Sequence, residues 1–143
     1  MLKHGYTYSG HATACAAALA NLDVFEEEDL FGRVRGLEAK LPGLLGGLAD
    51  LDGVSEVRTI GLTAAIQLDA QRFLAAGREP AEVVEACRRR GQLTRLLACG
   101  ALHFSPPFVA GEEQIADFAA AVADSVDEVV SAPAPAPSNA NRT

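Results

Sequence analysis

Apolar residues recur at helical spacing over the first third of this chain, where they predict two helices. In residues 12–28 they fall three or four positions apart, and the run Glu26-Glu27-Glu28 ends the pattern on a solvated face. A second helical pattern extends over residues 30–48. Pro42 and the glycines that follow it disfavour helix in the last turns, because proline lacks an N–H and glycine loses backbone entropy. We therefore expect the C-terminal half of this second helix to bend or fray.

Two further helices are predicted nearer the C-terminus. Pro80 stands in the first turn of one of them, where its missing N–H costs nothing, and Gly91 ends that helix. The other begins at Gly111 or Glu112 and has an apolar stripe that should pack on a sheet. The stripe consists of Ile115, Phe118, Val122, Val126 and Val129.

Short segments between these helices predict strands. A turn at Asp52-Gly53 precedes residues 54–58 and 62–68, which Thr59-Ile60-Gly61 connects as a hairpin. Two more short strands are expected around residues 93–96 and 101–104. Helices and strands in this order predict an α+β fold, in which a small and largely antiparallel sheet is covered by helices on one face.

The composition fits one globular domain and excludes several classes of function. The chain has 143 residues, of which 22% are charged, and its net charge of −7 argues against electrostatic binding to nucleic acid or to an anionic membrane. The basic run Arg88-Arg89-Arg90 is interpreted as a solvated face near a helix C-terminus. No segment has the pattern of a membrane span or a signal peptide, so we expect a cytoplasmic protein.

The cysteines indicate neither a disulfide framework nor a metal site. Cys15, Cys87 and Cys99 are odd in number, widely spaced and set among Ala, Leu and Glu. We interpret all three as small, partly buried apolar residues.

The loop His4-Gly5-Tyr6-Thr7-Tyr8-Ser9-Gly10-His11 is the most informative segment of the chain. It sets hydroxyls and backbone N–H groups directly before a helix, and these are the groups that bind a phosphate at a helix N-terminus. Thr7 and Ser9 would donate hydroxyl hydrogen bonds, and Gly10 would add a backbone donor. A second interpretation makes Ser9 the N-cap of the helix, and the residues alone leave both open.

Arg95 is the charged residue best suited to bind a substrate. A lone arginine at the start of a strand can bind a carboxylate through two parallel hydrogen bonds. Structural pairing with one of the 19 acidic residues is an equally open interpretation. Lys3 has the amine that a Schiff base requires, but it lies beside a terminus that offers no preorganised pocket. Lys40, the other lysine, is expected on an exposed helix face.

Several of these motifs, in this order, resemble the class III pyridoxal-phosphate-dependent aminotransferases, the ω-transaminase group. The loop of residues 4–11 followed by Ala14-Cys15-Ala16-Ala17 resembles a segment of that family's large domain. Val57-Arg58 to Leu68, Gly91 to Arg95 and Ser105-Pro106-Pro107-Phe108 then resemble successive landmarks of its C-terminal small domain.

The resemblance implies a fold and a domain organisation. The fold would be that of the small domain in an aspartate-aminotransferase-like transferase, preceded by the last loop and helix of the large domain. Residues 1–28 would be the end of the large domain and residues 29–130 the small domain. Residues 131–143, which begin as an Ala/Pro repeat, would form a disordered tail.

The resemblance also implies roles for four residues. Thr7 would reach across a dimer interface to the phosphate of pyridoxal 5'-phosphate in the neighbouring subunit, with Ser9 and Gly10 supporting the loop. Arg95 would face the substrate and pair with the carboxylate of an amino or keto acid. The implied substrates are small amino and keto compounds, the full-length form would be a homodimer, and no metal is involved.

Other parts of the family's site would precede Met1. They are the Schiff-base lysine, the aspartate that holds the pyridine nitrogen and a glycine-containing phosphate turn, so we expect this chain to correspond to the last third of such an enzyme. Ala12 also replaces a proline that commonly follows the loop histidine. Without the lysine the chain alone should be inactive. Two alternatives are a non-catalytic interaction or dimerisation module and a truncated gene product.

Overall fold

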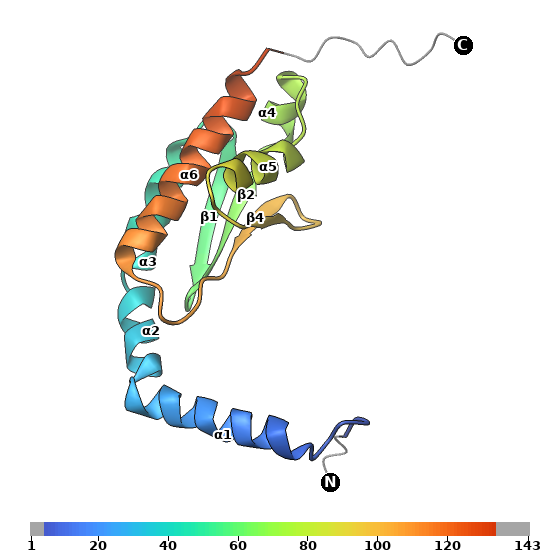
Figure 1. Cartoon of the computed structure of the whole chain (residues 1–143). Coiled ribbons are helices and arrows are strands. Elements are labelled where there is room, and N and C mark those ends of the chain that lie inside the picture. The colour runs from blue at the N-terminus through green and yellow to red at the C-terminus, as the bar shows by residue number, and fades with distance from the viewer. Residues whose placement is uncertain (1–4, 134–143) are drawn as a thin grey trace, which may run out of the picture.

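An antiparallel sheet of four strands forms one layer of the structure, and helices pack on one of its faces (Figure 1). The computed structural model describes residues 5–133. The strands lie in the order β1-β2-β4-β3 and are β1 (Val54–Ile60), β2 (Thr63–Leu68), β3 (Arg95–Leu96) and β4 (Ala101–Phe104). The predicted α+β fold with a small antiparallel sheet is confirmed.

Alternating burial along β2 gives the sheet a core face and an open face. Ala64, Ile66 and Leu68 are at most 3% exposed, whereas the residues between them are only half-buried. Ile66 pairs with Leu102 of β4, which is fully buried, so the two strands direct their apolar side chains to the same layer of helices. Residues of opposite parity in each strand therefore lie on the open face.

The last helix supplies the longest apolar surface of the core. α6 (Glu112–Ser131) buries the whole of the predicted stripe, namely Ile115, Phe118, Val122, Val126 and Val129. α5 (Ala81–Arg89) packs against α6 and buries Val83 and Cys87. No helix within residues 5–133, α6 included, combines the length and the apolar character needed to cross a membrane.

The second predicted helix is divided into three short elements. These are α2 (Leu30–Glu38), α3 (Leu41–Gly46) and a 3₁₀ turn, η1 (Gly47–Asp50). Pro42 stands in the first turn of α3, where its ring forbids a continuous helix from α2. The expected bend is confirmed, but the expected fraying is wrong: Leu41 and Leu45 are fully buried, and this packing holds α3 despite its glycines.

A short helix that the hydrophobic pattern does not predict follows β2. α4 (Ala70–Ala75) has fewer than two turns, too few for a helical period to be visible. The feature of the sequence that marks the start of α4 is its N-cap, Asp69. Oδ1 of Asp69 accepts hydrogen bonds from the backbone N–H groups of Gln71 (2.9 Å) and Arg72 (3.3 Å). Phe73 then enters the core and is fully buried.

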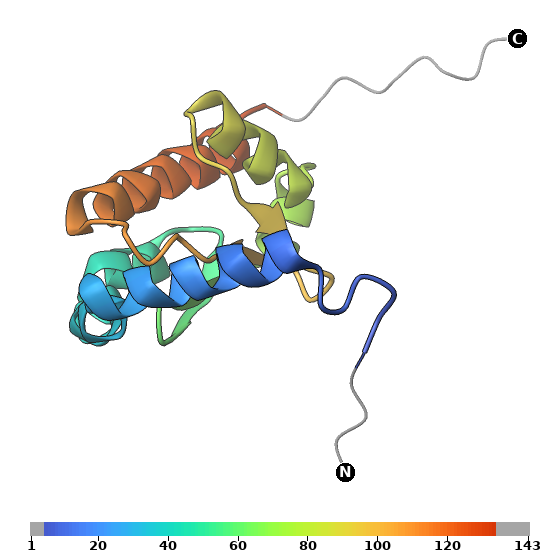
Figure 2. The same ribbon diagram turned by 60° about the horizontal axis from the view of Figure 1, so that its bottom comes forward.

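The first helix stands apart from the rest of the molecule. α1 (Ala12–Glu27) has no buried residue, and Figure 1 shows it running away from α2 below the sheet. Figure 2, in which this end comes forward, shows α1 crossing the end of the molecule with the N-terminal loop beyond it. Its attachment includes Phe25, whose ring lies 5.2 Å from that of Phe31 and 5.6 Å from that of Phe108.

The described residues include only the first three residues of the predicted disordered tail, 131–133. Ser131 is the last residue of α6, so the helix extends one residue into the segment expected to be disordered. Residues 134–143 lie outside the described part of the chain.

Candidate functional site

The loop before α1 is a tight turn that leaves its hydroxyl groups at the surface. The backbone N–H of Ser9 donates to the carbonyl of Tyr6 (2.9 Å), and Oγ of Ser9 accepts a hydrogen bond from the N–H of Tyr6 (2.8 Å). Thr7 lies between them and is exposed. Gly10 has a φ of +78°, a left-handed conformation that glycine adopts without strain, and it turns the chain into the helix.

His11, and not Ser9, caps the first helix. Nδ1 of His11 accepts a hydrogen bond from the backbone N–H of Ala14 at 3.4 Å, and His11 has the extended backbone of an N-cap. The capping interpretation of Ser9 is therefore wrong, because its hydroxyl is directed back to Tyr6 to close the turn. A histidine cap is rarer than a serine cap, so local preference pointed to the wrong residue.

The beginning of α1 has the groups that an anion requires. The first N–H groups of a helix have no partner within the helix, and the first turn of α1 contains no acidic residue. The exposed hydroxyl of Thr7 precedes these N–H groups in the same loop. Hydroxyl, backbone donors and a helix N-terminus together fit a phosphate group such as that of pyridoxal 5'-phosphate. Residues 5–133 contain no cluster of His, Cys, Asp and Glu that could hold a metal ion.

Arg95 lies far from this loop in the sequence, on the short strand β3. It is exposed, and its guanidinium makes no ion pair or hydrogen bond with any other residue of the described chain. Structural pairing with an acidic residue, the alternative weighed from sequence, is not observed in residues 5–133. Arg95 lines a shallow hollow of about 250 Å³ together with Leu93, Thr94, His103 and Ser105. A guanidinium in such a hollow can bind a carboxylate.

The one lysine within the described residues is engaged in an ion pair. Nζ of Lys40 lies 2.6 Å from Oε1 of Glu112, and both side chains are exposed, as the sequence predicts for Lys40. Lys3 lies outside the described residues. Neither the loop nor the hollow beside Arg95 therefore has a lysine among residues 5–133.

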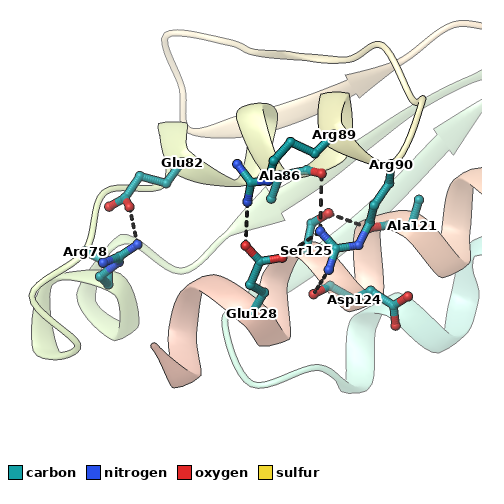
Figure 3. Close-up of polar contacts among 9 residues, drawn as sticks. All are labelled: Arg78, Glu82, Ala86, Arg89, Arg90, Ala121, Asp124, Ser125 and Glu128. Atoms are coloured by element: carbon teal, nitrogen blue, oxygen red, sulfur yellow. Dashed lines mark hydrogen bonds and ion pairs between the residues drawn. The ribbon is translucent and has the colours of Figure 1, made fainter. Parts of the chain in front are cut away.

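The run of three arginines at the end of α5 is more than a solvated face. Figure 3 shows Arg89 and Arg90 reaching from α5 toward Glu128 of α6, with which both form ion pairs. Nη2 of Arg90 also donates to the carbonyl of Asp124 at 3.5 Å. The hydrogen bond from Arg90, with that from Arg89, holds the pKa of the Glu128 carboxyl below its usual value. All three arginines are exposed near the C-terminus of α5, as interpreted from the sequence, and Arg88 pairs with Glu85 of its own helix.

The three cysteines differ more than the sequence suggests. Cys87 is fully buried, and burial raises the pKa of its thiol, against the opposing effect of a hydrogen bond with Ser125. Cys15 and Cys99 are exposed, so their interpretation as partly buried residues is wrong. All three are free thiols.

Arg33 is a positioning residue that the sequence did not single out. Its guanidinium donates to the carbonyls of Phe108 (3.2 Å), Val109 (2.9 Å) and Ala110 (3.1 Å), and so ties α2 to the loop after Ser105-Pro106-Pro107. An isolated arginine in a helix gives no local signal of contacts more than 70 positions away. The double-proline segment is a loop, as expected, and Arg33 holds its far end.

The sheet backed by helices, the preceding loop and α1 place this chain among the transaminases of the aspartate-aminotransferase-like fold. It superposes on a structure titled "Transaminase with L-ala" with a TM-score of 0.78 and 31% identity, covering 92% of this chain and 32% of that one. It superposes equally well on a thermostable ω-transaminase mutant from Pseudomonas jessenii (TM-score 0.78, 31% identity, 94% of this chain and 31% of that one).

The sequence comparisons define the family. The model of "Aminotransferase class-III" matches residues 1–126, so the chain belongs to the class III aminotransferase family. It is 40% identical over 114 residues to the ω-aminotransferase of Caulobacter vibrioides, covering 80% of this chain and 26% of that protein. It is 43% identical over 99 residues to the adenosylmethionine-8-amino-7-oxononanoate aminotransferase of Nitratidesulfovibrio vulgaris, covering 66% of this chain and 18% of that protein. The chain thus spans less than a third of these two relatives.

Proposed function

We propose that this chain forms the C-terminal part of a pyridoxal-phosphate-dependent transaminase, which moves an amino group between an amine or amino acid and a keto acid. The observation that carries the proposal is the family match over residues 1–126, which includes the exposed loop at the N-terminus of α1. Residues 1–28 belong in this proposal to the end of the large domain and residues 29–130 to the small domain. The absence of buried residues in α1 supports that boundary.

The proposed cofactor site uses the loop before α1. The hydroxyl of Thr7 binds the cofactor phosphate across the interface of a homodimer, while Ser9 and Gly10 shape the turn that presents it. Bound pyridoxal 5'-phosphate supplies an electron sink for the chemistry at the amino-bearing carbon. Toward the cofactor itself, the residues of this chain contribute binding and orientation at the phosphate end only.

The proposed substrate contact is Arg95. Its unpaired guanidinium lines an open hollow, so a substrate carboxylate can be bound there without first breaking an internal ion pair. Fixing the carboxylate orients the amino or keto carbon of the substrate relative to the cofactor. Arg95 thereby favours substrates that carry a carboxylate.

The Schiff-base lysine belongs, in this proposal, to polypeptide outside residues 5–133. Lys40 is held by Glu112 and lies on a different part of the chain from the loop and from Arg95. In this proposal neither Lys3 nor Lys40 is the Schiff-base lysine, so the chain by itself is inactive. The exposed free thiols of Cys15 and Cys99 fit a reducing compartment, which supports a cytoplasmic location.

Reduction with borohydride tests whether a lysine of this chain forms the Schiff base with the cofactor. The chain alone, mixed with pyridoxal 5'-phosphate and reduced, should yield no adduct on Lys3 or Lys40, as read by peptide mass mapping. A polypeptide that supplies the large domain of a class III relative should acquire transaminase activity when this chain is added. Thr7→Val should weaken cofactor retention in that complex, while Thr13→Val, on the first turn of α1, should not. A stoichiometric adduct on Lys3 or Lys40 would overturn the proposal.

A second candidate function is a non-catalytic interaction module. The observation that favours it is the exposed apolar surface around α1, which includes Leu19 (63% exposed), Leu22 (58%) and Phe31 (60%). Such a module would pair with itself or with a separate large domain. Sedimentation separates the two: a monomer that associates with no lysine-bearing large domain contradicts both candidates, and association without gain of activity favours the module.

A further inference from the structure

We propose that His103 and Arg95 together form one binding site for the substrate carboxylate, with His103 as a specificity-determining residue. This inference rests on the proposed role of Arg95 and adds a second donor to it. The two residues lie directly opposite each other on antiparallel strands, Arg95 on β3 and His103 on β4. Side chains opposed in this way begin about 5 Å apart and share one face of the sheet.

Both side chains lie on the open face of the sheet. His103 pairs on its other side with Ala65 of β2, which lies on the face opposite that of the buried Ala64 and Ile66. Ala65 is small, so it does not cover the imidazole. The hollow of about 250 Å³ beside Arg95 and a second one of about 320 Å³, which Ala65 also lines, are both lined by His103. The imidazole therefore stands between two hollows and is reachable from each.

The chemistry of these hollows suits an anion. Neither hollow is lined by a carboxylate among the described residues, and the first one adds the side chains of Thr94 and Ser105 to the two nitrogen-bearing groups. Oγ1 of Thr94 donates to the carbonyl of His103 at 2.8 Å, which fixes the backbone of β4 at this point. The side chains of Arg95 and His103 make no hydrogen bond within the described residues, so a carboxylate that lies between them can accept from both.

The other arginines show why Arg95 is available. Within residues 5–133 all but two arginines have an ion pair or donate to backbone carbonyls, and the exceptions are Arg95 and Arg35. Arg35 is an exposed residue of α2 and lines none of the hollows described here. It is therefore a matched control for an unpaired guanidinium without a neighbouring histidine.

The test uses this chain and acetate as the probe, with acetamide as the neutral isostere and ionic strength held constant with sodium chloride. Imidazole resonances are followed by NMR, and the acetamide titration measures the shifts that do not depend on charge. Acetate should shift the His103 signals saturably at millimolar concentrations, whereas acetamide should not. His103→Leu should weaken acetate binding about tenfold, as expected for the loss of one hydrogen bond to a charged group. His103→Gln, which keeps an N–H donor, should restore most of the affinity.

The variants also separate this inference from the proposed role of Arg95. Arg95→Leu should abolish saturable binding, and Arg35→Leu should leave it unchanged. If His103→Leu binds acetate as the unaltered chain does while Arg95→Leu does not, Arg95 acts alone and this inference fails. If neither variant changes binding, or if acetamide shifts the His103 signals as acetate does, the carboxylate site itself is wrong, although the membership of the family is unaffected. Thermal melts of each variant establish that it is folded.

Discussion

Oε2 of Glu128 lies 2.7 Å from Nη1 of Arg90, and this ion pair joins the C-terminal end of α5 to α6. Arg89 binds the other oxygen of the same carboxylate. Because α5 packs against α6, the pair fixes the C-terminal end of α5 on α6 (Figure 3). It is the contact through which acid is expected to act on the stability of this chain.

Glu128→Gln should lower the melting temperature at neutral pH and have little effect in acid. The pKa of Glu128 is lower in the folded chain than its ordinary value of 4.5, so the ion pairs stabilise the fold fully above that value. The stabilisation is lost as the pH falls through 4.5 and below the folded pKa. Melting curves across this range measure it. Asp127→Asn, one position away and without an ion pair, is the control; an equal loss in both variants would exclude the ion pair as the cause.

Cys87 should be inert to thiol reagents in the folded chain. Burial raises the pKa of its thiol and blocks access, whereas Cys15 and Cys99 are exposed. Titration with a disulfide reagent should modify two thiols under native conditions and the third only in denaturant, with mass mapping to assign them. Modification of Cys87 at the rate of Cys99 would mean that α5 separates readily from α6.

Gly53→Ala should destabilise the chain by about 1–3 kcal/mol, because a side chain at a left-handed position adds strain. Gly53 has a φ of +119°, and an added Cβ would lie 3.0 Å from Cγ2 of Val130 and 3.1 Å from Cγ1 of Val126. Gly36→Ala is the control, since nothing lies within 4 Å of its added Cβ. That change should stabilise α2 by about 0.5–1 kcal/mol. Urea denaturation measures both, and the opposite signs are the diagnostic result.

Phe73→Ala should cost about 3–5 kcal/mol of unfolding free energy, as for other fully buried aromatic side chains. Phe73 is the residue through which the short helix α4 joins the core, and it is fully buried. Phe31→Ala removes the same atoms from a residue that is 60% exposed, so its cost should be much smaller. Similar losses of urea midpoint in the two variants would show that α4 does not contribute to the core.

The sequence predicted an element correctly where a regular apolar pattern extends over a segment that packs against the core along its whole length. The stripe from Ile115 to Val129 is an example, because a helix of five turns repeats its signal several times. The segment 30–48 is the opposite case. Its leucines correctly predicted an apolar face that is buried. Pro42, however, divides the segment into separate helices, and α3 is held in place by its packing in the core and not by helix propensity.

The candidate site was predictable to the extent that it depends on contiguous residues. The loop around Thr7 and the position of Arg95 follow from the sequence, and the family match supports both as candidates. The capping role of His11 was not predictable, because Ser9 is the better cap in isolation and only the turn to Tyr6 removes it. The hydrogen bonds from Arg33 to the carbonyls of residues 108–110 were not predictable either, because these carbonyls lie more than 70 positions away in the sequence.

From the sequence alone follow the α+β class, the apolar stripe of the last helix, the candidate phosphate loop at residues 4–11 and the likeness to class III aminotransferases. Each of these depends on residues close together in the chain. The tertiary structure decided which polar side chains meet. A shift of one residue in the pairing of β3 with β4 would move His103 away from Arg95, since alternate residues of a strand face opposite sides. The packing of the core fixes that register, and with it the pair of donors on the open face.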